Sequence, residues 1–313
     1  MIAVIQRSGL DEEFHDGAVA VAAGDGSVTA FAGDVDRPFF IRSSAKPFQA
    51  HVSVTAGAPL DPVHVAVACA SHSGEPAHVA LVVDILARVG LDDSALRCPP
   101  ARPSLSADRR LAAVGDTEPH PRYHNCSGKH AAMLAACVES GWPLDSYLDP
   151  AHPLQRRVAD LMSEVSRTDV GPPGIDGCGA PVWRTTVRAM AIAYAALASD
   201  PDLASIYAVM ARYPALVSGV GRADAVIGQW FGAAAKGGAA GCMGVAAASH
   251  GVAVKAWSGS GPAAGVGAVA TLSGLGLGTV AIAKGVGEVA EPIVWGGGKE
   301  VGRMRSSVVL EVV

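Results

Sequence analysis

The chain has 313 residues, of which 50% are hydrophobic, and a formal net charge of −5. It is long enough to bury a large core, as one α/β domain or as two small ones. Its 24 Lys and Arg residues are scattered along the chain, which argues against a nucleic-acid-binding surface.

The sequence also indicates where the protein resides. The first residues lack a basic segment followed by a long apolar core, so no signal peptide is expected. The longest apolar tract, over 261–286, is interrupted by Gly and Pro, which favours buried helix and strand over a membrane span. Without an export signal, the six cysteines are expected to be reduced thiols. These features predict a cytoplasmic protein.

The first part of the chain is predicted to form strands and then helices. Gly24-Asp25-Gly26 is a hairpin-turn signal between two apolar segments. Pro47 suits the first turn of a helix that begins near Ser43 and Lys46. The apolar run Val63–Ala70 fits either a helix or a strand. Strands are expected over 2–6, 17–23, 27–32 and 38–42, and a helix is expected over 78–89.

The middle of the chain is predicted to be helical and the end to return to strands. After a loop over 98–115, helices are expected over 128–140, 153–166, 182–198, 201–212 and, weakly, 220–235. Strands over 242–248 and 252–257 are expected to form a hairpin around His250-Gly251, followed by a helix over 262–274 and strands over 289–295 and 301–312.

Strands at both ends that enclose a helical middle predict an α/β (α+β) fold. We expect one antiparallel sheet built from the two termini, with a helical subdomain inserted between them. The whole chain, 1–313, would be a single domain, with a sheet part over about 1–60 and 240–313 and a helical part over about 61–239.

The stretch His124–His130 places two imidazoles, a thiol, an amide, a hydroxyl and an amine just before an apolar run. Ser127 is predicted to cap this run as a helix and Gly141 to end it. A helix N-terminus favours anionic groups such as a thiolate or a substrate carboxylate. The alternative is an ordinary capped helix whose polar entry is solvated.

Ser43 and Lys46 lie three residues apart, so one helical turn places the hydroxyl and the amine on the same face. An amine whose pKa is lowered by burial can deprotonate a serine, and S-x-x-K is the acyl-enzyme signature of serine β-lactamases. Ser71 and Ser73 are similar to the second element of those enzymes, and Lys255, followed by Ser258-Gly259, is similar to the third. A capped helix with a solvated lysine is the alternative for the first pair.

Cys126 and Cys178 are the two cysteines in polar, Gly-rich surroundings. Two thiolates neutralise a divalent cation, and a neutral amine from Lys129 can add a third ligand. By ligand preference alone His124 or His130 would be the third ligand. Two unlinked thiols are the alternative.

Four motifs in order along the chain carry a resemblance to a known family: Arg42–Gln49, Cys69–Pro76, His124–His130 and Asp176–Pro181. They resemble the bacterial asparaginase II family of the thermolabile, rhizobial type. The resemblance covers nearly the whole chain and includes the segments 212–214, 217–219 and 235–239.

The resemblance implies a serine β-lactamase-like fold, a homodimer and hydrolysis of L-asparagine to L-aspartate and ammonia. It implies two Ser–Lys pairs, Ser43 with Lys46 and Ser71 with Lys255, and one zinc ion per chain. The implied zinc ligands are Cys126, Lys129 and Cys178, and the implied substrate-binding residues are Arg42, Asn125, His130 and Asp176.

Two positions differ from the family pattern. Ala240 stands where the family usually has Glu, and Trp257-Ser258-Gly259 stands where an acidic residue and a glycine are usual. The expected mechanism has Ser43 as nucleophile with Lys46 as base, and Ser71 as nucleophile in the alternative. Another serine acyl hydrolase, such as a glutaminase or a β-lactamase-like enzyme, and a non-catalytic zinc-binding protein are the competing functions.

Overall fold

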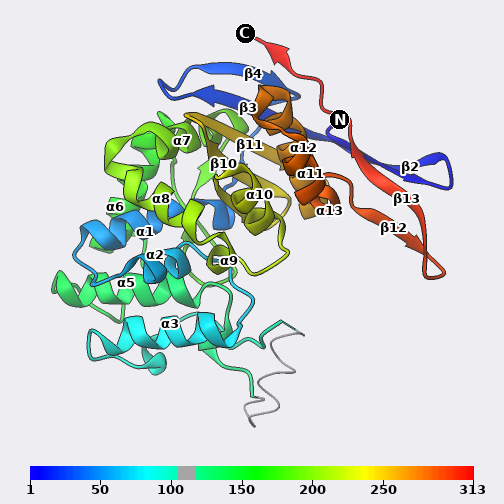
Figure 1. Cartoon of the computed structure of the whole chain (residues 1–313). Helices are drawn as coiled ribbons and strands as arrows, with labels where there is room; N and C mark the ends of the chain where they lie inside the picture. The colour runs from blue at the N-terminus through cyan, green and yellow to red at the C-terminus, as the bar shows by residue number, and fades with distance from the viewer. Residues whose placement is uncertain (105–117) are drawn as a thin grey trace.

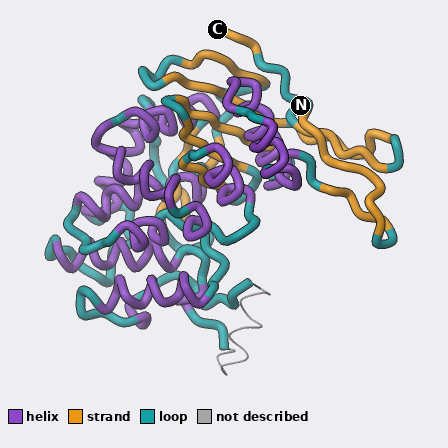
Figure 2. The backbone as a smooth tube through the Cα atoms, viewed as in Figure 1, coloured by secondary structure: helices purple, strands orange, loops and turns teal. Residues whose placement is uncertain are grey.

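The computed structural model describes residues 1–104 and 118–313. The loop expected over 98–115 therefore lies largely outside the described residues. Within them the chain forms a mixed α/β fold with antiparallel sheets, as predicted, and the helices cluster beside and below the strands (Figures 1 and 2).

The main sheet has six strands and takes them from both ends of the chain. Its order is β14 (Glu311–Val312), β4 (Val28–Ala32), β3 (Gly17–Ala23), β11 (His250–Ala256), β10 (Cys242–Ala247) and β9 (Ala234–Gly238). In the centre Val252 lies opposite Val21 and Val254 lies opposite Val19. Strand β9 has a neighbour on one side only and is therefore an edge of the sheet.

Each face of this sheet is covered by a different helix. Alternate residues of β3 belong to separate apolar clusters: Ala20 packs on the side of α7 (Val187–Ser199), and Val21 on the side of α11 (Gly261–Leu272). The period of two in a strand explains this division. Because both faces are covered, β3 is apolar throughout rather than alternating.

A second sheet was not anticipated. Its four strands are β12 (Ile293–Gly296), β13 (Lys299–Ser306), β1 (Ala3–Arg7) and β2 (Leu10–His15), in that order. It extends away from the helices (Figure 1). The prediction of one sheet was wrong because β2 has almost no apolar alternation: its first five residues are exposed.

The helical part is built around α5 (Ser127–Glu139), which is buried from Ser127 to Cys137. Helices α1 (Lys46–Thr55), α2 (Pro62–Ala68) and α3 (Pro76–Ala87) pack against it. The approach to α2 is close, because a Cβ atom at Gly128 would lie 2.2 Å from the Val67 carbonyl oxygen. The other described helices are α6 (Pro153–Ser166), α8 (Ala204–Arg212), α9 (Pro214–Val217), α10 (Ala223–Phe231), α12 (Val280–Gly285) and α13 (Gly287–Ala290).

Two further pairs of short antiparallel strands lie outside the two larger sheets. Strand β5 (Phe39–Phe40) pairs with β8 (Arg184–Thr185), and β6 (Gly174–Ile175) pairs with β7 (Pro181–Val182). None of the described helices is both long and apolar enough to cross a membrane.

Several local predictions need correction. Cys126, not Ser127, is the N-cap of α5, because the Ser127 hydroxyl donates to the Arg122 carbonyl instead. The turn between β10 and β11 is Ala248-Ser249, both at positive φ, and His250 already belongs to β11. The weak helix over 220–235 ends early, and its last residues begin β9.

Candidate functional site

Lys46, the first residue of α1, is almost completely buried. Its amine donates to the Ser71 hydroxyl at 3.0 Å, to the Asn125 carbonyl at 3.3 Å and to the Ala70 carbonyl. Burial lowers its pKa to about 8. A neutral amine in hydrogen-bond contact with a serine is a general-base arrangement.

The structure pairs the predicted residues differently from the sequence-based expectation. Lys46 contacts Ser71, and no hydrogen bond joins it to Ser43 within the described part of the chain. Ser43 lies in a 3₁₀ turn over Arg42–Ala45 and is half-buried, whereas Ser71 is 6% exposed. The three-residue spacing identified the amine but not the hydroxyl that it reaches.

Lys255 does not pair with Ser71, so that expectation was wrong. Its amine donates at 2.6 Å to the carbonyls of Ala240 and Ala256 and lies beside the rings of Phe39 and Trp257. Strand β11, which carries Lys255, is separated from the edge of the sheet by β10 and β9.

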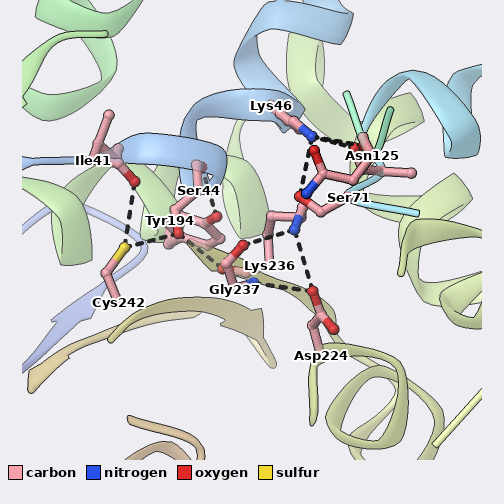
Figure 3. A network of polar contacts seen from close by, with 11 residues as sticks. Ile41, Ser44, Lys46, Ser71, Asn125, Tyr194, Asp224, Lys236, Gly237 and Cys242 are labelled. Atoms are coloured by element: carbon pink, nitrogen blue, oxygen red, sulfur yellow. Dashed lines mark hydrogen bonds and ion pairs between the residues drawn. The ribbon is translucent and has the colours of Figure 1, made fainter. Parts of the chain in front are cut away.

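Lys236, and not Lys255, is the strand lysine that points towards Ser71 (Figure 3). It is fully buried on edge strand β9, and its amine lies 3.2 Å from the Asp224 carboxylate and donates to the Gly237 carbonyl at 2.7 Å. Figure 3 shows Lys46, Ser71, Lys236 and Asp224 pointing towards one another. The nearby Lys236 ammonium also helps to lower the pKa of Lys46, after burial.

Asp224 is held as an anion although it is buried. Burial acts to raise its pKa, but Lys236 and the hydrogen bond from the Gly237 amide, at 3.2 Å, lower the pKa below its ordinary value. Sequence reasoning missed Lys236 and Asp224. The string Lys236-Gly237-Gly238 is itself close to the K-[ST]-G pattern, and its position on an edge strand was the missing information.

A cavity of about 520 Å³ opens beside these groups. Ser43, Ser71 and Asn125 line it together with Asp224 and residues of the edge strand β9. Both predicted serines therefore face one space, although Lys46 contacts only one of them.

Cys126, Lys129 and Cys178 converge, and each is at most 4% exposed. The Lys129 amine lies 3.2 Å from the Cys178 sulfur. A hydrogen bond with the Cys126 thiol, together with the Lys129 ammonium, lowers the pKa of Cys178 to about 5 against the effect of burial. Burial acts to lower the pKa of Lys129, but Cys178 and Cys126 raise it above its ordinary value.

This donor set fits a divalent cation, because two sulfur atoms and one amine nitrogen lie together in one buried place. Within the described residues no group of three or more His, Cys, Asp or Glu converges on a common point, so such a site depends on the lysine. His124 does not take its place: its Nδ1 accepts from the Cys126 amide at 3.0 Å.

Asn125 links Cys126 to the cavity that the two serines line, and His130 is buried next to Lys129 in the sequence. The His130 Nδ1 lies 2.7 Å from the Tyr147 hydroxyl, and its buried Nε2 has no partner among the described residues. Burial lowers the pKa of His130 well below its ordinary value, so the ring is neutral. Asn125 lines the cavity, and its side-chain oxygen accepts from the Cys126 thiol at 3.2 Å.

Arg42 and Asp176 bind each other. The guanidinium Nε lies 2.7 Å from the carboxylate, which also accepts from the Gly177 amide at 2.8 Å. Arg42 adopts a φ of +53°, a left-handed conformation that is uncommon outside glycine. Arg42 directly precedes Ser43 and Asp176 lies two residues before Cys178, but neither member of the pair lines the cavity.

Comparisons with known proteins add the following findings. A family model described as L-asparaginase II matches residues 3–306. No curated protein sequence matches the chain. Among solved structures, similarity is found to Mglu in its glutamate form, at 19% identity over 85% of this chain, with a TM-score of 0.48. This chain spans 63% of that one.

Two further structures are similar at the same level. One is a Bacillus glutaminase crystallised in the presence of 4.3 M NaCl, at 12% identity over 83% of this chain and 91% of that one, with a TM-score of 0.45. The other is a β-lactamase from Mycobacterium bovis, at 16% identity over 82% of this chain and 94% of that one, with a TM-score of 0.44.

Proposed function

This chain belongs to the L-asparaginase II family, and we propose that it hydrolyses L-asparagine to L-aspartate and ammonia. Family membership supports an amidohydrolase. The observation that carries the chemical step is the buried amine of Lys46, 3.0 Å from the Ser71 hydroxyl at the wall of a cavity that Ser43 also lines.

In the proposed mechanism Ser43 attacks the side-chain amide carbon, because its hydroxyl is the more accessible of the two. Lys46, which contacts Ser71 and not Ser43, accepts the proton through the Ser71 hydroxyl, and Ser71 then returns a proton to the leaving ammonia. Water then hydrolyses the aspartyl-enzyme. Lys236 lies on the other side of Ser71 from Lys46 (Figure 3), and its ammonium favours the oxyanion that develops.

Ser71 is the second candidate for the nucleophile, because the Lys46 contact favours it directly. The two possibilities differ in which residue carries the aspartyl group. Rapid acid quench during turnover, followed by peptide mass spectrometry, would place the added mass on residue 43 or on residue 71.

Substitution tests the serine mechanism as a whole. We expect Ser43→Ala and Ser71→Ala each to lower ammonia release from asparagine by about 100-fold or more, as loss of a nucleophile or a proton-transfer group does. Ser94→Ala, on an exposed turn, is the matched control. Near wild-type rates in both active-site variants would exclude a serine nucleophile at either position.

Cys126, Lys129 and Cys178 are the proposed zinc ligands, with one ion per chain. A zinc ion there would add positive charge beside Asn125 and help to orient the substrate. Arg42 and Asp176 carry the charges that complement the carboxylate and ammonium groups of asparagine, respectively. They would separate from each other to bind it.

The competing functions are separated by one assay. Release of ammonia is measured with asparagine and with glutamine, and ring opening is measured with a chromogenic β-lactam. Turnover of asparagine above glutamine supports the proposal. Turnover of the β-lactam alone would favour a different acyl hydrolase, and no turnover at all would favour a zinc-binding protein without catalytic activity.

A further inference from the structure

The cavity beside the serines is larger than free asparagine requires. Its volume of about 520 Å³ falls in the range of about 300–1,000 Å³ that encloses drug-sized ligands, which are much larger than one amino acid. Ser43, Ser71 and Asn125 form part of its wall. The Arg42–Asp176 pair is outside the lining, so these two groups do not occupy the cavity.

The remaining wall is largely apolar. Met243 of β10, Pro262 of α11, Val289 of α13 and Pro292 line it. An apolar wall of this kind contributes nothing to the release of ammonia from asparagine. It suits a hydrophobic group attached to the amide nitrogen.

Arg222 supplies a cation to the same cavity. It lies just before α10, after Gly219 and Gly221, whose φ values of +127° and +80° require glycine. The Arg222 side chain has no hydrogen bond or ion pair to any described residue. The nearby Asp224 carboxylate is already bonded to the Lys236 amine and the Gly237 amide. Arg222 is therefore available to a carboxylate in the cavity.

The edge strand β9 also lines the cavity, through Gly237 and Gly238, and Ala239 follows directly after it. The outer backbone groups of an edge strand are a common docking site for an extended peptide. Glu288 adds an exposed carboxylate at the wall, which suits an ammonium group. The cavity thus presents a cation, an apolar wall and a strand edge to a group attached to the amide nitrogen.

We propose that the cavity accepts an amino acid joined through its nitrogen to the side-chain carbonyl of aspartate, so that the enzyme also hydrolyses β-aspartyl amino acids. The leaving amino acid places its carboxylate on Arg222 and its apolar side chain against Met243, Pro262 and Val289. The amide C–N bond breaks, water supplies OH to the aspartyl carbonyl carbon and H to the nitrogen, and L-aspartate and a free amino acid are released. The inference rests on the proposed serine amidohydrolase chemistry.

The test uses the full chain and three substrates: L-asparagine, β-aspartyl-leucine and β-aspartyl-leucinamide, which lacks the terminal carboxylate. Release of ammonia, leucine or leucinamide is measured. We expect wild-type kcat/KM to be about 10- to 100-fold higher for β-aspartyl-leucine than for its amide, the range for one charge-assisted contact. Arg222→Ala should remove this preference, and Arg222→Lys should retain part of it.

Arg212→Ala is the matched control, because Arg212 stacks on Tyr213 at the end of α8, away from the cavity lining. The preference for the carboxylate should survive in this variant. Ammonia release from asparagine without leucine release would overturn the inference while leaving the proposed function intact. Equal rates with the two β-aspartyl substrates, or an equal loss on both in Arg222→Ala, would also overturn it. No hydrolysis of any of the three would instead contradict the proposed function.

Discussion

At the scale of single residues, the state of Lys46 determines when the site can act. Its pKa is lowered to about 8, so the amine is protonated below that pH and becomes a base above it. We therefore expect kcat/KM for asparagine to rise with pH up to about 8 and then to level off. A pH profile of initial rates measures this directly.

The matched variant for this prediction is Lys46→Arg, which keeps the positive charge but remains protonated at every accessible pH. It should lose about 100- to 10,000-fold in kcat/KM, the usual contribution of a general base. A profile in Lys46→Arg that still rises near pH 8 would mean that another group is the base.

The two strand lysines should respond differently to substitution. Lys236→Met leaves the buried Asp224 unpaired, so we expect a loss of about 3–5 kcal/mol in the free energy of unfolding and a loss of activity. Lys255→Met removes contacts to two backbone carbonyls and should cost about 1–3 kcal/mol with little effect on turnover. Urea unfolding and ammonia release are the measurements.

A double variant separates stability from chemistry. Lys236→Met combined with Asp224→Leu removes both buried charges and should recover most of the stability without recovering activity. Recovery of activity in the double variant would show that Lys236 has only a structural role. Loss of activity in Lys255→Met would show that Lys255, as the sequence predicted, takes part in catalysis.

The residue types of the site were predictable, but their partners were not. Cys126 and Cys178 could be grouped from ligand chemistry, Lys129 was added to them by the family resemblance, and the structure places the three together. The partner of Lys46 could not be read from spacing, because Ser71 reaches it through a tertiary contact between segments 25 residues apart. The roles of these residues remain predictions.

At the scale of elements, the first turn of α5 depends on close packing against α2. A Cβ atom at Gly128 would lie 2.2 Å from the Val67 carbonyl oxygen. Gly128→Ala should therefore push the helix start away, lower the free energy of unfolding by about 1–3 kcal/mol and disturb the adjacent Cys126 and Lys129. Thermal or urea unfolding and ammonia release measure both effects.

Gly177→Ala is the control for Gly128→Ala, because it is close to the same thiols and a Cβ there meets nothing within 4 Å. It should change stability by less than about 0.5 kcal/mol. Equal effects of the two substitutions would contradict the packing argument.

Two elements were predicted with the bounds that the structure has: α6 from its amphipathic periodicity, and β3 as a short apolar run before a turn. Strand β2 was missed because Leu10-Asp11-Glu12-Glu13-Phe14 is solvent-exposed, so burial leaves no pattern in its sequence. The end of the predicted helix over 220–235 was wrong because its apolar residues continue into the buried edge strand β9, and apolar composition alone does not separate helix from strand.

At the scale of the whole molecule, the thiol cluster joins the start of α5 to the loop between β6 and β7, two segments about 50 residues apart. A zinc ion there would connect them. Removing it with a chelator should lower the melting temperature, by an amount that corresponds to about 3–4 kcal/mol for a metal present at 100 to 1,000 times its Kd. Calorimetry with and without the chelator measures the shift.

Elemental analysis provides the control for this prediction. Cys126→Ser and Cys178→Ser should contain less zinc than the wild type, which should contain one ion per chain. Cys137→Ser, at a buried thiol elsewhere on α5, should keep its zinc. The same metal content in all four proteins would rule out this site.

The pairing of β1 with β13 and of β3 with β11 has a consequence for how the protein is made. On the ribosome β1 and β3 can pair at once with β2 and β4, but their other neighbours, β13 and β11, are translated only towards the end of the chain. The second edge of the apolar β3 must wait through the synthesis of the helices that precede β10 before β11 pairs with it. A nascent chain stalled before residue 250 would therefore hold an incomplete sheet and depend on a chaperone to stay out of aggregates.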